Sequence, residues 1–301
     1  MPDRNAEEVY AHGAKSCLAR LLSCSAVILS WRVTGAADET TKFRILLTND
    51  DGIRAEGLIA LAKEMRTLDA EVVVVAPAED QSGMSHALTY HDPFRVEEVR
   101  SEKGELFGYS VNGTPADSVL LGAKVMMAEH PPNLVISGIN RGENLGAVSH
   151  LSGTVGAAME ATTLGIPAIA VSLGRAQPMD YFYAAKVTKT IALAVREHGL
   201  PKGTCLNVNV PSLPENQIKG LVVVPQSDWR GEIRHEKRAD LFNRPYFWRG
   251  FTVTAPEAPP DTDVGAFYSG HVTVTPIKLD WTDQAELPEL KKWGLAERKK
   301  E

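Results

Sequence analysis

The chain has 301 residues, 44% apolar and 23% charged, which suits one large globular domain with an appendage or two small domains. The formal net charge of −6 argues against nucleic acid as the main partner, because tracking a phosphate backbone needs a basic face. No run reaches the ~18 apolar residues of a membrane-spanning helix. The three cysteines are odd in number and lack metal-ligand spacing, which argues against a disulfide framework and a cysteine-bound metal.

Residues 1–40 differ from the rest and are predicted to be an N-terminal extension outside the fold. A basic start, an apolar stretch at 21–31 and small residues at 34–37 resemble a secretory signal. Arg32 closes the apolar stretch, and a start codon placed too early fits nearly as well. We expect a cytoplasmic protein, with export to the periplasm as the alternative if residues 15–37 act as a signal peptide.

From residue 42 the pattern alternates between strands and helices. Buried strands are predicted at 43–47, 72–75, 133–137, 168–171 and 205–210, and an antiparallel pair at 94–99 and 106–111. Helices are predicted at 56–66, 115–129, 154–164 and 179–198. This succession predicts an α/β fold with a doubly wound, mostly parallel sheet, formed by a core of residues 41–225.

Residues 226–301 are predicted to be a C-terminal extension, irregular up to a strand at 271–276 and a final helix at 284–293. Aromatic residues crowd its first part: Trp229, Phe242, Tyr246, Phe247 and Trp248. Aromatic residues are enriched at interfaces, which favours assembly through this segment. The alternative is that they close one edge of the monomer's own core.

Adjacent carboxylates follow the first predicted strand, in Thr48-Asn49-Asp50-Asp51-Gly52. The carboxyl end of a strand is where α/β sheets place their ligands. Asp50 and Asp51 repel each other, and a cation beside them relieves that repulsion. An ordinary Asp-Gly turn with solvated side chains is the alternative.

Two more loops rich in small polar residues follow predicted strands, Ser82-Gly83 after the second and 137–144 after the third. In a parallel sheet all three loops emerge at one edge, so their side chains can converge. Carboxylates with neutral hydroxyl and amide oxygens suit a hard divalent cation, and we expect one Mg²⁺ or Mn²⁺ per subunit. A zinc site would more often show His or Cys ligands.

Ser152-Gly153-Thr154 stands at the start of a predicted helix. Free N–H groups, a glycine and two hydroxyls make an anion site, and next to a metal cluster phosphate is the expected anion. The alternative is plain helix capping by Ser or Thr. Neither a dinucleotide-binding fingerprint nor a P-loop is present in the sequence.

Together these motifs resemble the SurE (survival protein E) family. The resemblance rests on five strings in order: Ile45 to Gly52, Ala76-Pro77 with Ser82-Gly83, Asn112 to Asp117, Ser137 to Asn140 with Asn144-Leu145-Gly146, and Ser152 to Thr154 with Ala157 to Glu160. It covers about 43–175 and resumes at 207–211, 262–263 and 272–276. It implies a Rossmann-like core, a metal-dependent phosphatase acting on nucleoside 5′-monophosphates (often also 3′-nucleotides and short polyphosphate), and a homodimer or homotetramer assembled through the C-terminal extension.

The resemblance also implies roles for single residues. Its metal ligands fall on Asp50, Asp51, Ser82 and Asn140. Its phosphate loop falls on Ser152, Gly153 and Thr154, with Asn49 and Asn144 lining the same pocket. The chain departs from the family in having Leu151 where an aromatic residue is common, and Ala147-Val148 where an acidic residue often follows Asn-Leu-Gly. Both departures bear on substrate preference more than on the metal site.

The expected mechanism is single-step hydrolysis in which Asp50 or Asp51, with Asn49 nearby, orients or deprotonates water. An aspartyl-phosphate intermediate is the alternative mechanism. A non-catalytic metal or nucleotide-binding module is the alternative function. Glu160 is expected either to hydrogen-bond the glycine-rich loop or to form a surface salt bridge. His150 and Arg141 are expected to be solvated loop residues, with general acid and phosphate clamp as their alternative roles.

Overall fold

The computed structural model describes residues 42–252 and 258–294, all of which belong to one compact unit. The expected N-terminal extension lies outside the described residues. Within those two ranges, no helix is both long and apolar enough to cross a membrane.

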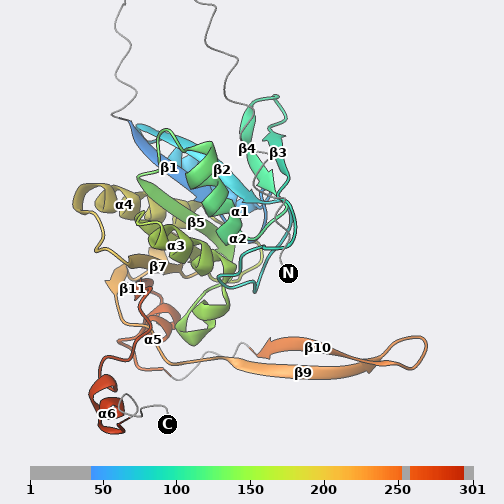
Figure 1. Ribbon diagram of the computed structural model, residues 1–301, viewed down its shortest axis with the longest axis vertical. Coiled ribbons are helices and arrows are strands. Elements are labelled where there is room, and N and C mark those ends of the chain that lie inside the picture. Colours follow the sequence, from blue (N-terminus) through green and yellow to red (C-terminus); the bar gives the residue numbers. More distant parts are fainter. Residues whose placement is uncertain (1–41, 253–257, 295–301) are drawn as a thin grey trace, which may run out of the picture. The chain divides into compact units, whose positions relative to one another are not determined.

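A nine-stranded sheet forms the centre of the fold, in the order β3-β4-β2-β1-β5-β6-β7-β11-β8 (Figure 1). Its strands are β1 (Phe43–Thr48), β2 (Ala70–Pro77), β3 (Val96–Arg100), β4 (Leu106–Val111), β5 (Leu134–Arg141), β6 (Ala168–Leu173), β7 (Thr204–Val210), β8 (Leu221–Val223) and β11 (Val272–Lys278). Strands β4, β2, β1, β5, β6 and β7 pair in parallel, whereas β3 pairs antiparallel with β4 and β11 with β7. The predicted α/β fold with a mostly parallel sheet is confirmed.

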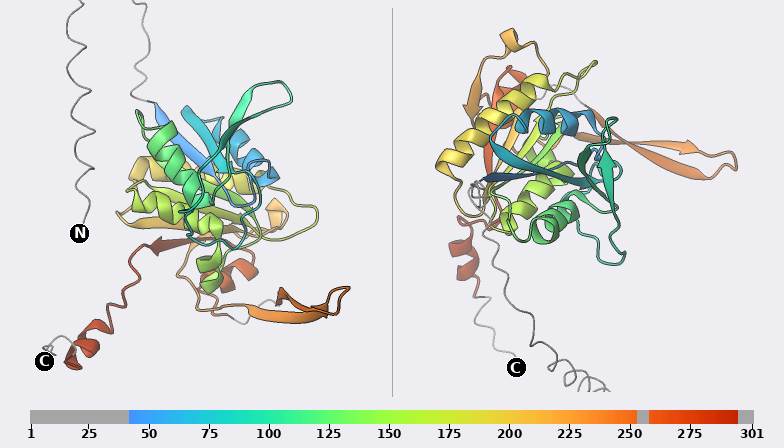
Figure 2. Two further views of the ribbon diagram at one scale, coloured as in Figure 1. Left: turned by 45° about the vertical axis from the view of Figure 1, so that its right-hand side comes forward. Right: turned by 90° about the horizontal axis from the view of Figure 1, so that it is seen from above.

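Helices cover both faces of this sheet, as Figure 2 shows. The helices are α1 (Glu56–Met65), α2 (Pro115–Leu121), α3 (Gly153–Thr163), α4 (Phe182–His198), α5 (Asp263–Tyr268) and α6 (Leu287–Lys292). Successive side chains of a strand point to opposite faces, so Ile45 and Leu47 join the core under α1 and α4, while Leu46 joins the core under α2 and α3. Burial on both faces explains the uninterrupted apolar run of β1.

The C-terminal part is more regular than expected. Residues predicted to be irregular form the hairpin of β9 (Glu232–Ala239) and β10 (Pro245–Thr252), which pair only with each other (Figure 1). Strand β11 lies inside the main sheet between β7 and β8. The division at residue 225 stays a prediction, but the segment after it is not separate from the core.

Three other segments differ from the prediction. The helix expected at 115–129 is α-helical only to Leu121 and continues as a π-helical turn, Gly122–Met126. The glycine-rich loop contains a 3₁₀-helix, Gly146–Leu151, just before α3. A second 3₁₀-helix, Glu215–Gln217, precedes β8.

The strand order places the carboxyl ends of β1 and β5 side by side. From β1 the chain first adds β2 and β4 on one side of β1, and it then returns to add β5 on the other side. The winding of the sheet therefore reverses at β1. Ligands of open α/β sheets bind in the crevice at such a point. The loops after β1, β2 and β5 all emerge at this end of the sheet.

Candidate active site

The carboxylate of Asp50 lies against the first turn of α3. It accepts one hydrogen bond from the backbone N–H of Thr154, at 3.0 Å, and another from the Thr154 hydroxyl. Gly153 permits this approach, because a Cβ there would lie 2.9 Å from the Cβ of Asp50. Asp50 is 2% exposed, and this burial raises its pKa to about 6. The Thr154 hydrogen bond opposes the shift, and the charge of Asp51 adds to it.

Asp51 points to the carboxyl end of the neighbouring strand β5. Its Oδ2 accepts a hydrogen bond from the backbone N–H of Arg141 at 2.9 Å. Burial raises the pKa of Asp51, while the Arg141 N–H and guanidinium lower it. Asn49 Nδ2 donates to the carbonyl of Gly52 at 2.9 Å, which closes the turn that carries both carboxylates. The predicted juxtaposition of these loops is therefore present.

The loop after β2 carries Ser82, and residues on both sides of Ser82 are hydrogen-bonded to other segments. Gln81 N–H donates to the Asp50 carbonyl at 2.7 Å, and Ser85 Oγ donates to the His150 carbonyl at 2.6 Å. His86 Nε2 lies 2.6 Å from Glu160 Oε2. Glu160 is buried in α3, so both expectations for it were wrong: it is not a surface salt bridge, and it bonds the Ser82 loop rather than the glycine-rich loop.

Strand β5 runs further than the predicted strand 133–137, so Asn140 lies within β5 and Asn144 in the loop that follows it. Asn140 Nδ2 donates to the Gly142 carbonyl at 2.7 Å, so Oδ1 is the atom of this side chain that the predicted metal site would use. Asn144 is buried and its Nδ2 donates to Ser172 Oγ at 2.8 Å, while its backbone N–H donates to Asn209 Oδ1 at 2.7 Å. These bonds tie the glycine-rich loop to β6 and β7.

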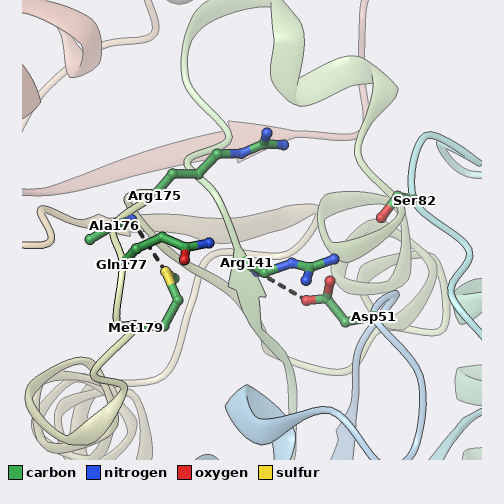
Figure 3. A pocket seen from close by; sticks show the side chains of 7 residues that line it. All are labelled: Asp51, Ser82, Arg141, Arg175, Ala176, Gln177 and Met179. Atoms are coloured by element: carbon green, nitrogen blue, oxygen red, sulfur yellow. Dashed lines mark hydrogen bonds between the residues drawn. The ribbon is translucent and has the colours of Figure 1, made fainter.

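Two adjoining cavities contain the predicted metal ligands. The first, about 330 Å³, has Asp50, Ser82, Asn140, Asn144 and Ser152 among its polar lining residues. The second, about 490 Å³, is lined by Asp51 and again by Ser82. Figure 3 shows Asp51, Ser82 and Arg141 on one side of this second cavity, with Gln177 and Met179 on the other.

The three residues at the start of α3 have different surroundings. Ser152 is the N-cap, accepts a hydrogen bond from the Val155 N–H at 3.2 Å, and lines the first cavity. Thr154 is fully buried and gives both its donors to Asp50. Capping by Ser152 is thus present, and a phosphate contact by Ser152, Gly153 or Thr154 stays a prediction.

Sequence reasoning missed two residues that line these cavities. Arg175 lines both of them and follows β6, and Trp229 lines the first, together with Val148 and Leu151. Arg175 has no sequence signal of its own, since it stands in an irregular segment, and Trp229 was expected among the aromatic residues of an interface rather than in the site. The polar support from Asn209 could have been noticed, because an asparagine within a buried strand needs a hydrogen-bond partner.

The donor set fits a hard divalent cation. Two carboxylates with raised pKa values stand side by side, and a cation would relieve both their burial and their repulsion. The Oδ1 of Asn49 is buried and has no hydrogen-bond partner among the described residues. In those same residues no group of three or more His, Cys, Asp or Glu side chains could hold a metal ion, which leaves neutral oxygens to complete the set, as Mg²⁺ and Mn²⁺ allow.

Known proteins are similar to this chain in sequence and in fold. Residues 45–232 match the family described as Survival protein SurE. The chain is 46% identical over 255 residues to the 5′-nucleotidase SurE of Natranaerobius thermophilus, covering 83% of this chain and 98% of the relative. It is 44% identical over 253 residues to that of Geobacter sp. (strain M21), covering 84% and 99%.

A solved structure agrees with these relatives. The crystal structure of the SurE protein from Aquifex aeolicus superposes with a TM-score of 0.73 at 38% identity, and the match covers 83% of this chain and 99% of that one. Both the sequence and the arrangement of the sheet are therefore shared over most of the described length. The chain belongs to the SurE family.

Proposed function

We propose that this chain is a divalent-metal-dependent 5′-nucleotidase, which hydrolyses nucleoside 5′-monophosphates to nucleoside and phosphate. The observation that supports this most is the convergence of Asp50, Ser82 and Asn140 on one cavity at the point where the winding of the sheet reverses. Relatives named 5′-nucleotidase SurE support the same activity. By the same resemblance, 3′-nucleotides and short polyphosphate are further candidate substrates.

Asp50, Asp51, Ser82 and Asn140 would hold one Mg²⁺ or Mn²⁺ per subunit. Such a cation supplies positive charge beside the transferring phosphoryl group and lowers the pKa of bound water. Ser152 lines the same cavity, and the guanidinium of Arg141 or Arg175 would add positive charge at its wall. These groups favour a bound phosphate dianion.

In the reaction, a water oxygen forms a bond to phosphorus as the bond to the 5′ oxygen of the nucleoside breaks. The water gives up a proton to Asp50 or Asp51, and the leaving oxygen gains one from solvent or from a neighbouring acid. The alternative, attack of an aspartate on phosphorus, would leave an acyl phosphate. Borohydride trapping of that species at Asp50 or Asp51 would overturn the single-step mechanism.

The activity is tested by phosphate release from a panel of nucleoside monophosphates at fixed Mg²⁺ or Mn²⁺, with and without EDTA, from pH 5 to 9. We expect release that EDTA abolishes and that Asp50→Asn or Asp51→Asn reduces at least tenfold. Asp69→Asn is the matched control, because Asp69 is an exposed carboxylate before the amino end of β2. Absence of metal-dependent release at every pH would favour the non-catalytic binding module.

We also infer that the chain forms a homodimer or homotetramer through the β9–β10 hairpin. Every residue of β9 is exposed, and Phe242, Phe247 and Trp248 are 80%, 61% and 58% exposed. Exposed apolar side chains in such density are typical of an interaction surface. The cytoplasmic location stays a prediction.

A further inference from the structure

We propose that Trp229 forms the stacking surface for the nucleobase of the substrate, in the cavity that is also lined by Asp50, Ser82 and Asn140. The inference rests on the proposed nucleotidase function. It assigns a specificity role to a residue that stands between the sheet and the hairpin.

The backbone around Trp229 is fixed to the glycine-rich loop. The Trp229 carbonyl accepts a hydrogen bond from the Ala147 N–H at 2.8 Å. The carboxylate of Asp263 accepts from the N–H groups of Gly146 and Ser227, both at 2.8 Å. Gly146 has a positive φ of 53°, and a Cβ there would lie 2.5 Å from the Trp229 carbonyl oxygen. The backbone of Trp229 is therefore bonded to the loop that carries Asn144, although Trp229 itself lies between β8 and β9.

Trp229 both packs against an apolar cluster and lines the cavity. Trp229 is half-buried and packs against the cluster of Leu145, Val264 and Phe267. Val148 and Leu151 line the cavity beside it, and Leu151 is 43% exposed. An aromatic ring fixed in this way loses little freedom when a ligand stacks on it.

The cavity has the polarity of a nucleoside monophosphate. Its predicted metal ligands suit the phosphate, and Trp229 suits a flat aromatic base, within a volume of about 330 Å³. Stacking on an aromatic ring tolerates any base, because every base has a π face. The chain has Leu151 where the family commonly has an aromatic residue, so the Trp229 indole supplies the aromatic surface that Leu151 lacks.

A second aromatic site competes for the base. Trp281 lines a separate cavity of about 270 Å³, where its ring meets that of His150 edge-on at 5.7 Å. Ser152 lines both cavities, so the phosphate alone does not decide between them. Asp50 lines the cavity of Trp229 but not the cavity of Trp281, which favours the Trp229 cavity as the place of the base.

The test compares kcat/KM for adenosine 5′-monophosphate with kcat/KM for ribose 5-phosphate, which lacks only the base. We expect Trp229→Leu to lower this ratio roughly ten- to a hundredfold, chiefly through KM, because Leu keeps apolar packing and loses the π face. Trp229→Phe should keep most of the ratio. Trp281→Leu, which removes an indole that is 76% exposed, should leave the ratio unchanged.

Equal ratios for the wild type, Trp229→Leu and Trp229→Phe would overturn the inference, as would a fall confined to Trp281→Leu. Equal losses on both substrates in Trp229→Leu would also overturn it, since Trp229 would then only support the fold. Failure of the wild type to hydrolyse either compound would refute the proposed function instead, so the two failures are distinguishable.

Discussion

Thr154 gives both of its hydrogen-bond donors to a single carboxylate, that of Asp50. The two residues are 104 positions apart in the chain, and their contact joins the end of β1 to the start of α3. Thr154 thereby fixes the position of a predicted metal ligand, and the positive end of the helix dipole stabilises that ligand's ionised form.

The first prediction concerns the removal of the Thr154 hydroxyl. Thr154→Val keeps the shape of the side chain but takes one donor from a buried carboxylate, which should weaken Mn²⁺ binding and kcat/KM about ten- to a hundredfold, or roughly 1.5–3 kcal/mol. Thr154→Ser restores the hydroxyl and should recover most of both. Mn²⁺ binding is measured by calorimetry. If the Val variant binds Mn²⁺ normally but is inhibited less by inorganic phosphate, Thr154 contacts phosphate instead.

The fold was predictable wherever strands are buried on both faces. The apolar runs of β1 and β2 and the amphipathic pattern of α1 and α4 could be identified from single segments. The β9–β10 hairpin could not, because both its faces are exposed and β9, Glu-Ile-Arg-His-Glu-Lys-Arg-Ala, has no alternation of apolar and polar residues. Helix α5, with six residues, is too short for a helical period to be visible.

The site was predictable as a set of loops, but not in its contacts. Parallel pairing brings Asp50, Ser82 and Asn140 together whatever their side chains do. One hydroxyl caps α3 and the other holds Asp50, and this division depends on contacts between segments that are distant in the chain. The sequence alone therefore predicts the same roles for Ser152 and Thr154. The structure separates them: Ser152 caps the helix and lines the cavity, and Thr154 holds Asp50.

A second prediction follows from this separation and concerns Ser152. Ser152→Gly should cost only a few tenths of a kcal/mol in stability, because glycine is a tolerated N-cap, whereas Ser152→Ala should cost about 0.5–2 kcal/mol. If the hydroxyl also binds phosphate, both variants should lose kcat/KM about ten- to a thousandfold. Unchanged kcat/KM in Ser152→Gly would confine Ser152 to capping. Thermal unfolding and steady-state kinetics separate the two effects.

The third prediction concerns pH and the buried Asp50. Its folded pKa of about 6 lies above the ordinary value of 3.8, so the folded state binds the proton more tightly than the unfolded state. Without metal, ionised Asp50 therefore destabilises the fold above pH 6, and stability is regained as the pH falls from 6 toward 4. In EDTA at pH 8, Asp50→Asn should be more stable than the wild type by roughly 2–3 kcal/mol.

Urea unfolding at pH 8 and pH 4 measures the difference in stability between Asp50→Asn and the wild type at each pH. Most of the advantage of Asp50→Asn should be lost at pH 4, where Asp50 is neutral in the folded state and about half ionised in the unfolded state. A variant that is less stable at pH 8 would mean that the Thr154 donors stabilise the ionised carboxylate by more than its burial destabilises it.

The fourth prediction concerns the His86–Glu160 pair, which links the Ser82 loop to α3 at 2.6 Å. Glu160→Ala should release this loop and lower kcat/KM about tenfold, with weaker Mn²⁺ binding, because Ser82 loses its fixed position. Glu160→Gln can still hydrogen-bond His86 and should recover much of the loss. Glu64→Ala is the control, since it removes the partner of Lys189, an ion pair of 2.9 Å between α1 and α4. Equal kinetic losses in Glu160→Ala and Glu64→Ala would reject a positioning role.

The last prediction concerns assembly through the hairpin. Phe247 and Trp248 expose most of their surface in β10, and burying two such side chains in a partner would contribute several kcal/mol. The wild type should scatter light as a dimer or tetramer at micromolar concentration. The double variant Phe247→Ser, Trp248→Ser should scatter as a monomer or a smaller assembly.

Its control is Trp293→Ser, which removes an indole that is 69% exposed just after α6 and should leave the mass unchanged. Both variants should keep the far-ultraviolet circular dichroism of the wild type, because neither position belongs to the buried core. A wild type that is monomeric at micromolar concentration would reject assembly by this hairpin. The exposed aromatic side chains would then need another explanation, such as closing an edge of the chain's own core in solution.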